Sequence, residues 1–272
     1  MNEYDFTFKG LLISPVSLDR IPLYLDLFKD AFPSFDATSE YLNWLYSENP
    51  LGHFVGYDAI YENEVVAHYV CVPTQIDSYP RKSLLSLNTA TRSDFRGRGL
   101  LKILANATFE RYHDDYSCVV GVANSQSVGA LTRHLGFTKI GNLELRFGRL
   151  YSAEKGRRVY SEDDLKWRCN NPKLVLRHKI YESNKAVIFF KPVKFLTSLK
   201  SIVPLTSVKR NSRKIPAWKK IGLTIDWRRD ANPLIFLPKR LKPSPLALVF
   251  RPLSENSVEN LTCWTLADFD AF

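Results

Sequence analysis

The sequence predicts an α/β fold in which helices cover the faces of one mixed sheet. The first observation is an antiparallel meander, because three strand-like runs follow one another between residues 53 and 92. The second is the alternation of strand-like and helix-like runs after it, which is typical of a sheet covered by helices. Hydrophobic residues make up 45% of the 272 residues, so the chain can bury a sizeable core.

Each element of the first 150 residues has a local signal. Residues 17–32 carry apolar residues at helical spacing, with Ser17 or Asp19 as a candidate cap. Glu62-Asn63-Glu64 joins two strands as a hairpin, and Gly136 stops a helix. In chain order we expect a strand at 10–17, helices at 17–32 and 39–48, strands at 53–61, 65–73 and 84–92, a helix at 99–116, a strand at 117–124, a helix at 127–137 and a strand at 139–152.

The second half of the chain repeats part of the first. The stretch LNWLYSENP, with Trp44, is echoed by LKWRCNNP, with Trp167, and each copy ends in an Asn-Pro pair. Each is followed by a strand pair that turns at IYENEVVA or IYESNKAV, and the matched order of three features favours duplication over chance similarity. We therefore expect two domains, 1–150 and 151–272. Residues 196–245, rich in Lys and Pro, fit no expected element.

Charge is unevenly distributed along the chain. The net charge is +10, but residues 1–150 hold 14 Lys and Arg against 17 Asp and Glu, whereas residues 151–272 hold 24 against 11. A basic half is a candidate nucleic-acid surface, yet clusters such as VKRNSRK and LPKRLK are short and show no nucleic-acid motif with interleaved aromatic residues. Attraction of small polyanionic substrates explains the charge as well, and we expect no nucleic-acid partner.

Cysteine spacing and hydropathy narrow the class of protein further. The four cysteines lie far apart without a CxxC pair, so neither a metal site nor a disulfide framework is expected. The start MNEYDFTFKGLLISP lacks a basic segment followed by an apolar one, and no apolar run approaches the roughly 20 residues that span a bilayer. We therefore expect a cytoplasmic protein without membrane insertion.

Residues 95–101, FRGRGLL, carry the clearest chemical signal. They lie between an expected strand and an expected helix, where backbone N–H groups lack a partner within the helix and its dipole attracts anions. Gly97 and Gly99 leave room for a phosphate, and Arg96 and Arg98 can add charge-assisted hydrogen bonds. The loop has neither the Gly-Lys-Ser/Thr of a Walker motif nor the spacing of a dinucleotide fingerprint. It predicts a pyrophosphate cradle, the alternative being a glycine turn with solvated arginines.

Two segments together resemble the GNAT acyltransferase superfamily. The first, LNTATRSDFRGRGLLKIL, has a strand, a loop of the family pattern Arg/Gln-x-x-Gly-x-Gly/Ala and a helix; Arg96 and Gly99 match this pattern and Leu101 departs from it. The second, VVGVANSQSVGALTRHLGF, is a strand that ends in a polar residue, followed by a helix that closes with Gly-Phe. The resemblance covers residues 10–150. It implies a GNAT fold with an acyl-CoA site, and a second half that is a degenerate GNAT-like copy.

In this family two neighbouring parallel strands splay apart, here 84–91 and 117–123, and the pantetheine arm of CoA lies in the gap like an added strand. The resemblance implies CoA contacts from backbone groups around Ala90 and Thr91, from the amides of Arg96, Gly97, Arg98, Gly99, Leu100 and Leu101, and from Asn124 and Ser127 near the thiol end. An N-cap is the alternative role for Asn124 and Ser127, and they can serve both.

The groups that move protons are less defined. Many family members use a Tyr as the thiol acid where Thr132 stands, and some carry a glutamate base on the strand at 84–91, which has no acidic residue here. His68, on the preceding strand, is a candidate base because imidazole titrates in the right range, and Asn88 is expected to contact substrate or orient a water. The alternatives are a structural histidine and an amide bonded within the sheet. An ordered water or an already neutral amine can also act without a side-chain base.

The stretch EYLNWLYSENP lies where this fold shapes its acceptor pocket. The candidate acceptor-binding residues, which combine aromatic rings with one amide, are Trp44, Tyr41, Tyr46, Asn49 and Tyr69. Core packing is the alternative for Trp44, and the echo at Trp167 favours it, because a structural reason acts in both halves.

The order of YLNWLYSENP, AHYVCVP and LLSLNTATRSDFRGRGL also resembles bacterial GNAT N-acyltransferases that act on nucleotide-linked amino sugars for surface polysaccharides. This resemblance implies a dTDP-linked amino-dideoxyhexose as the acceptor and an acetyl or short hydroxyacyl group as the donor. The alternatives are a peptide, aminoacyl or aminoglycoside amine, or a non-catalytic basic binding protein on the same fold. A fused second half can replace a partner subunit, so we expect a monomer.

Overall fold

The computed structural model describes residues 3–32, 36–150, 155–181, 185–190, 199–206, 214–229, 246–254 and 257–269. The basic clusters at 208–213 and 237–242 lie outside these residues, as do other parts of the Lys- and Pro-rich stretch.

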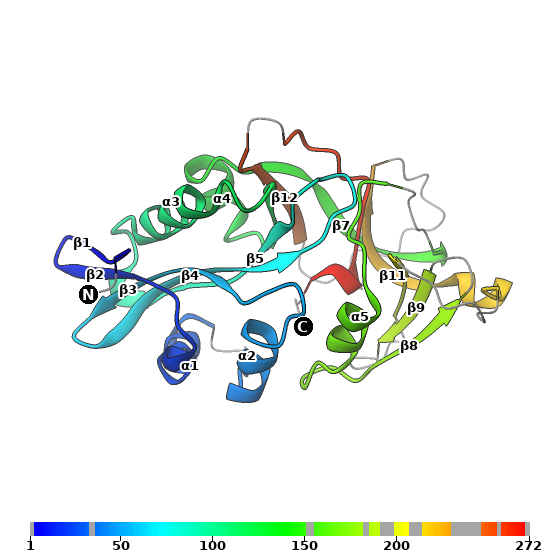
Figure 1. The fold of residues 1–272 in the computed structure, drawn as a ribbon, viewed down its shortest axis with the longest axis horizontal. Coiled ribbons are helices and arrows are strands. Elements are labelled where there is room, and N and C mark those ends of the chain that lie inside the picture. Colours follow the sequence, from blue (N-terminus) through cyan, green and yellow to red (C-terminus); the bar gives the residue numbers. More distant parts are fainter. Residues whose placement is uncertain are drawn as a thin grey trace.

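A mixed sheet of ten strands, in the order β1-β2-β3-β4-β5-β6-β12-β7-β11-β13, forms the centre of the molecule (Figure 1). Its strands are β1 (Phe6–Phe8), β2 (Leu11–Pro15), β3 (Val55–Tyr61), β4 (Glu64–Thr74), β5 (Ser83–Thr91), β6 (Cys118–Ala123), β7 (Thr138–Arg149), β11 (Ile221–Arg228), β12 (Leu246–Pro252) and β13 (Cys263–Thr265). Glu62 and Asn63 turn β3 into β4 with φ of 49° and 65°, the left-handed pair that a two-residue hairpin needs. The predicted meander and alternation are confirmed, and β1 is a short strand that the sequence did not predict.

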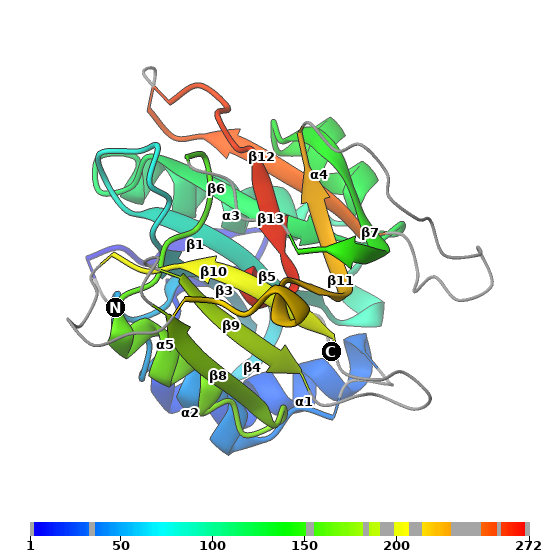
Figure 2. The same cartoon turned by 90° about the vertical axis from the view of Figure 1, so that its right-hand side faces the viewer.

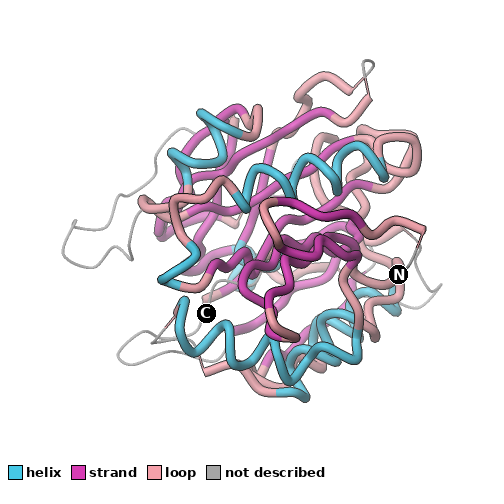
Figure 3. The backbone as a smooth tube through the Cα atoms, turned by 90° about the vertical axis from the view of Figure 1, so that its left-hand side faces the viewer, coloured by secondary structure: helices cyan, strands magenta, loops and turns pink. Residues whose placement is uncertain are grey.

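Helices cover both faces of this sheet. α1 (Ile21–Ala31) and α2 (Ser39–Tyr46) lie on one face, and α3 (Leu100–Tyr112) and α4 (Val128–His134) lie on the other (Figures 1 and 3). Because side chains alternate along a strand, β4 sends His68 towards the Tyr24 ring of α1 and Tyr69 towards the Phe109 ring of α3. Within the described ranges, no helix combines the length and the apolar character needed to cross a membrane.

The described second half repeats part of the element order of the first (Figure 2). α5 (Glu162–Cys169) leads into a three-stranded sheet of β8 (Leu176–Tyr181), β9 (Lys185–Phe190) and β10 (Lys200–Pro204), as α2 leads into β3, β4 and β5. Leu199, next to β10, forms a parallel bridge with Leu223 of β11, which corresponds to the parallel pairing of β5 with β6.

The two halves exchange strands in the centre of the large sheet. β12 lies between β6 and β7, and β7 lies between β12 and β11. β6 pairs with β12 along Cys118–Ala123, and β11 pairs with β7 over the same length, along Ile221–Asp226. β7 and β12 pair with each other, with Leu143 opposite Leu246. β6 and β11 thus occupy equivalent places on either side of the β12–β7 pair, whereas the next strands differ, since β5 follows β6 and β13 follows β11. The boundary predicted at residue 150 does not separate two sheets.

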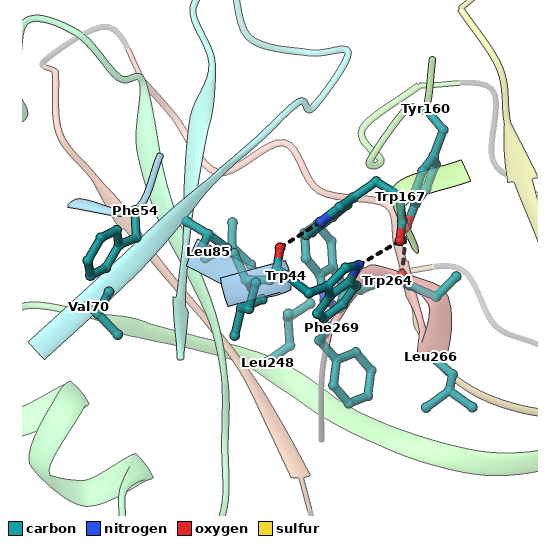
Figure 4. Packing of buried hydrophobic residues seen from close by; sticks show 14 of the residues in the cluster. Trp44, Phe54, Val70, Leu85, Tyr160, Trp167, Leu248, Trp264, Leu266 and Phe269 are labelled. Atoms are coloured by element: carbon teal, nitrogen blue, oxygen red, sulfur yellow. Dashed lines mark hydrogen bonds between the residues drawn. The ribbon is translucent and has the colours of Figure 1, made fainter. Parts of the chain in front are cut away.

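Two tryptophans join the halves on the side of α2 and α5 (Figure 4). Trp44 Nε1 donates to the Trp167 carbonyl at 2.8 Å, and Trp167 Nε1 donates to the Trp44 carbonyl at 2.9 Å. Their rings stack with centroids 4.8 Å apart, and both are buried. The echoed tryptophans therefore make reciprocal contacts in the core, in agreement with the packing interpretation.

The C-terminal segment 263–269 fills the gap between β10 and β11. β13 pairs with β11, where Asp226 lies opposite Thr265, and the 3₁₀ turn Leu266–Asp268 contacts both β10 and β11. Tyr160 Oη donates to the Ala267 carbonyl at 2.7 Å. The place between β10 and β11, which corresponds to the place between β5 and β6 in the first half, is therefore occupied by the chain itself.

Candidate functional site

β5 and β6 separate shortly after they meet. Leu84, Leu85 and Ser86 pair with the start of β6, and β5 then continues to Thr91. Beyond Ser86, no described strand pairs with β5 on that side, although β4 pairs with its other side as far as Thr91. The expected splay is present, and it leaves an open strand edge that can accept an extended ligand.

The end of β5 presents Thr91 rather than Ala90 to this gap. The Arg92 N–H donates to the Val66 carbonyl of β4 at 2.8 Å. Because backbone groups alternate along an antiparallel ladder, those of Thr91 point away from β4 and those of Ala90 point towards it. The Thr91 carbonyl accepts a hydrogen bond from Arg96 Nε at 3.2 Å, which ties the strand end to the glycine loop.

The two glycines of the loop adopt left-handed backbone conformations. Gly97 has φ of 74° and Gly99 has φ of 81°, and a Cβ atom at either position would meet no atom within 4 Å. Backbone conformation, rather than crowding within the protein, therefore requires glycine at both positions. The empty space above them is space into which a ligand can come close to the backbone.

The start of α3 offers a row of free amides. Gly99 is the N-cap, and its carbonyl accepts the first bonds of the helix, from the N–H groups of Lys102 and Ile103. Within the part of the chain that the structure describes, the amides of residues 97–101 donate to no protein acceptor. Arg98 donates to the Asp94 carbonyl at 3.0 Å and stacks over the Phe95 ring, and both loop arginines are exposed. Free amides, a helix N-terminus and two cations suit a phosphate group.

Asn124 and Ser127 close the turn between β6 and α4. Asn124 Oδ1 accepts hydrogen bonds from the Gln126 and Ser127 amides, both at 3.0 Å, and from Ser127 Oγ at 3.0 Å. Asn124 thus closes the turn before α4, whereas the side chain of Ser127, the N-cap of α4, makes no capping hydrogen bond; both residues lie beside the end of β6, next to the splay. Thr132, at the position of the usual thiol acid, donates its hydroxyl to the Val128 carbonyl of its own helix.

The two catalytic candidates, His68 and Asn88, meet on one hydroxyl group. His68 Nε2 lies 3.4 Å from Tyr46 Oη, and Asn88 Nδ2 donates to the same oxygen at 3.1 Å. Asn88 has φ of 46° and lies in a bulge, because Val70 pairs with Leu87 whereas His68 pairs with Ala90. The bulge turns the Asn88 side chain towards α2 at the point where β5 leaves β6.

A buried carboxylate completes this group of residues. Asp58 Oδ1 lies 2.7 Å from His68 Nδ1, and Asp58 Oδ2 accepts from Arg20 and Tyr24, each at 2.8 Å. The Asp58 and His68 side chains have no exposed surface. Burial raises the pKa of the Tyr46 phenol, and burial together with Asp58 raises that of Tyr24, so both act as neutral hydroxyl groups.

Three acceptor candidates lie in the core instead of the site. Trp44 is 2% exposed against Trp167, and Tyr69 is fully buried beneath α3, on the sheet face opposite His68. Asn49 is buried, donates to the Pro73 carbonyl at 2.9 Å and accepts from the Leu51 amide. These side chains therefore have packing roles. Of the two tyrosines of α2, Tyr41 is buried against the Trp44 ring, and Tyr46 is the one that reaches Asn88.

The sequence contained a signal for Asp58 that was not used. Asp58 interrupts the strand-like run HFVGYDAIY as Asn88 interrupts LLSLNTAT, and a polar side chain among apolar neighbours in a strand needs a partner. In the hairpin, Asp58 lies directly opposite His68, so the β3–β4 register alone brings the two side chains together.

Comparisons with known proteins support the architecture. No family model and no curated protein sequence matches the chain. A Pyrococcus horikoshii protein assigned as an acetyltransferase matches with a TM-score of 0.56 and 12% identity, over 96% of each chain. The CoA-bound GNAT family N-acetyltransferase YhbS of Escherichia coli matches with a TM-score of 0.41 and 19% identity, over 49% of this chain and 71% of its own. The chain therefore shares the overall fold of the Pyrococcus horikoshii protein over nearly its whole length.

Proposed function

We propose that the protein is an acyl-CoA-dependent N-acyltransferase. The observation that carries this proposal is the open edge of β5 beside a glycine loop with free amides. An extended thioester arm and a pyrophosphate, held at a fixed separation in one molecule, match these two features in chemistry and in order.

The residues of the gap and loop fit CoA. The open edge of β5, with the Thr91 backbone facing the gap, would pair with the amide groups of pantetheine. The amides of residues 97–101 and the exposed guanidinium groups of Arg96 and Arg98 would hold the pyrophosphate. When bound, CoA supplies the acyl group as a thioester. The chain's own contribution is to fix this group beside Asn88 and the acceptor amine, and such placement alone lowers the barrier greatly.

For the acceptor we propose the amine of a nucleotide-linked amino-dideoxy sugar. The second half carries 24 basic against 11 acidic residues, and two diphosphate-bearing substrates would be drawn to such a surface. We further propose that the protein acts in the cytoplasm as a monomer, since the exchange of β7 and β12 already joins two GNAT-like halves within one chain.

Calorimetric titration with CoA tests the cofactor. We expect binding to the wild type and a loss of about tenfold or more in Arg96→Glu, because a charge-assisted contact becomes a repulsion. Arg149→Glu, an equal charge reversal at an exposed position of β7, should bind CoA like the wild type. Absence of binding in the wild type would refute the proposal.

An acceptor screen with acetyl-CoA tests the substrate class. Acylation of dTDP-amino sugars, with peptides, polyamines and aminoglycosides inert, is the expected result. Turnover of a peptide or aminoglycoside instead would assign the alternative acceptor. DNA or RNA binding that falls steeply with salt, without acyl transfer, would indicate a non-catalytic binding protein.

A further inference from the structure

We propose that the buried chain Asp58–His68–Tyr46 is a one-directional hydrogen-bond chain that orients the Asn88 amide. In this orientation the Asn88 carbonyl oxygen is presented to the acceptor, so the site prefers an acceptor that donates an N–H. The preference for an amine rests on the proposed acyl transfer; the direction of the chain does not.

The direction is set at Asp58. A carboxylate only accepts hydrogen bonds, and Asp58 Oδ2 already accepts from Arg20 and Tyr24. Its other oxygen lies 2.7 Å from His68 Nδ1, so that ring nitrogen must carry a hydrogen and donate it.

Charge balance fixes the next step. Arg20, 2.8 Å from Asp58, already neutralises the buried carboxylate, so a second proton on the fully buried imidazole would leave an uncompensated positive charge. The imidazole is therefore neutral, and His68 Nε2 has a lone pair to offer. The Tyr46 hydroxyl, 3.4 Å away, donates to it and keeps its own lone pair for one further donor.

That further donor is the Asn88 amide. Asn88 Nδ2 donates to Tyr46 Oη at 3.1 Å, which leaves Asn88 Oδ1 without a donor among the described residues. The side chain is only partly buried and lies where β5 separates from β6. Asn88 is therefore a positioning group with a fixed polarity: a neutral amine or an ammonium group can donate to Oδ1, whereas an acceptor without N–H or O–H cannot.

Asp58→Asn is designed to reverse the chain. Arg20 and Tyr24 both donate to the Oδ2 side, so the amide oxygen of the new side chain would occupy that side and its NH₂ group would face His68. His68 Nδ1 must then accept and Nε2 must donate to Tyr46. The Tyr46 hydroxyl would donate onward to Asn88 Oδ1, and the Asn88 NH₂ group would face the acceptor.

Nitrogen-15 NMR of labelled histidine measures this direction without any substrate. We expect the wild type to show His68 with a hydrogen on Nδ1 and a bare Nε2, and Asp58→Asn to show the opposite tautomer. His68→Gln identifies the signal among the five histidines. A doubly protonated ring, or the Nε2–H tautomer, in the wild type would overturn the proposal. If Asp58→Asn does not fold, the wild-type spectrum still decides.

Kinetics measures the effect on the acceptor. Tyr46→Phe keeps the ring stacked on Phe54 at 4.5 Å but removes the hydroxyl that holds Asn88. KM for the amine should rise on the order of tenfold, with CoA affinity unchanged, because one oriented hydrogen bond is lost. Tyr79→Phe removes a hydroxyl bonded to the Val258 carbonyl and should leave both constants unchanged. An unchanged amine KM in Tyr46→Phe overturns the orienting role, whereas a wild type that does not bind CoA overturns the proposed function and leaves the NMR result to stand by itself.

Discussion

Gly99→Ala separates the two reasons for a glycine in the FRGRGLL loop. Gly99 has φ of 81°, and a Cβ atom there would meet no protein atom within 4 Å. The cost to stability is therefore only that of placing alanine in the left-handed region, about 1–2 kcal/mol. For a chain of this size that lowers Tm by roughly 2–4 °C per kcal/mol, measured by thermal unfolding without ligand.

Gly10→Ala is the matched control. Gly10 has φ of 78° and the same open surroundings, but it lies between β1 and β2. Both variants should lose the same stability, whereas only Gly99→Ala should lose CoA affinity, since its methyl group enters the space above the free amides. One weakened charge-assisted bond corresponds to about 1.5–3 kcal/mol, or roughly tenfold to hundredfold in Kd by calorimetry. Equal CoA affinity in both variants would refute the cradle, and a much larger loss of stability in Gly99→Ala than in Gly10→Ala would refute the backbone argument.

Three further predictions concern the rest of the molecule. Trp44→Phe and Trp167→Phe should each lower the free energy of unfolding by about 1–3 kcal/mol in urea titrations, because each leaves one buried carbonyl without its donor; a clear inequality would contradict their reciprocal roles. Burial raises the pKa of the Cys118 thiol from 9.0 to about 12, so its stabilising effect is present below pH 9 and is lost as the pH rises towards 12. Cys118→Ala should therefore flatten the fall in stability over that range, and an unchanged slope would show that the thiol has no part in it. Calorimetry should give one CoA per chain, because segment 263–269 fills the second gap; two equivalent sites would contradict this.

The parts of the site that follow from short-range rules were predictable from the sequence. A strand, a glycine loop and a helix start are adjacent in the chain, so FRGRGLL fixes the backbone conformations of Gly97 and Gly99 and the position of the free amides. Asn88 stood out because it is polar within an apolar strand, and His68 because an imidazole on the preceding strand can act as a base. These predictions needed no knowledge of which strands are neighbours.

The link between these residues depends on contacts that the sequence does not encode locally. Tyr46 reaches His68 of β4 and Asn88 of β5 from the last residue of α2, which is a tertiary contact. The sequence of this helix alone offered Trp44 as an equally good candidate for the acceptor site. Because side chains alternate along a strand, His68 and Tyr69 must point to opposite faces of the sheet, so they cannot both belong to one site. A test for period two along AHYVCVP would have removed Tyr69 from the acceptor candidates.

The two places where a strand separates from its parallel neighbour differ in what fills the gap. Where β5 separates from β6 the gap is open, and a glycine loop follows; where β10 separates from β11 the gap holds β13 and the turn after it, and no such loop follows. Tyr160 and Arg168 both donate to the Ala267 carbonyl, which fixes the filling segment on the side of α5. A strand edge left open in the core of a protein costs free energy, because its N–H and C=O groups lack partners. In the second half β13 supplies such partners to β11, whereas in the first half no described strand pairs with β5 beyond Ser86 on the side of β6.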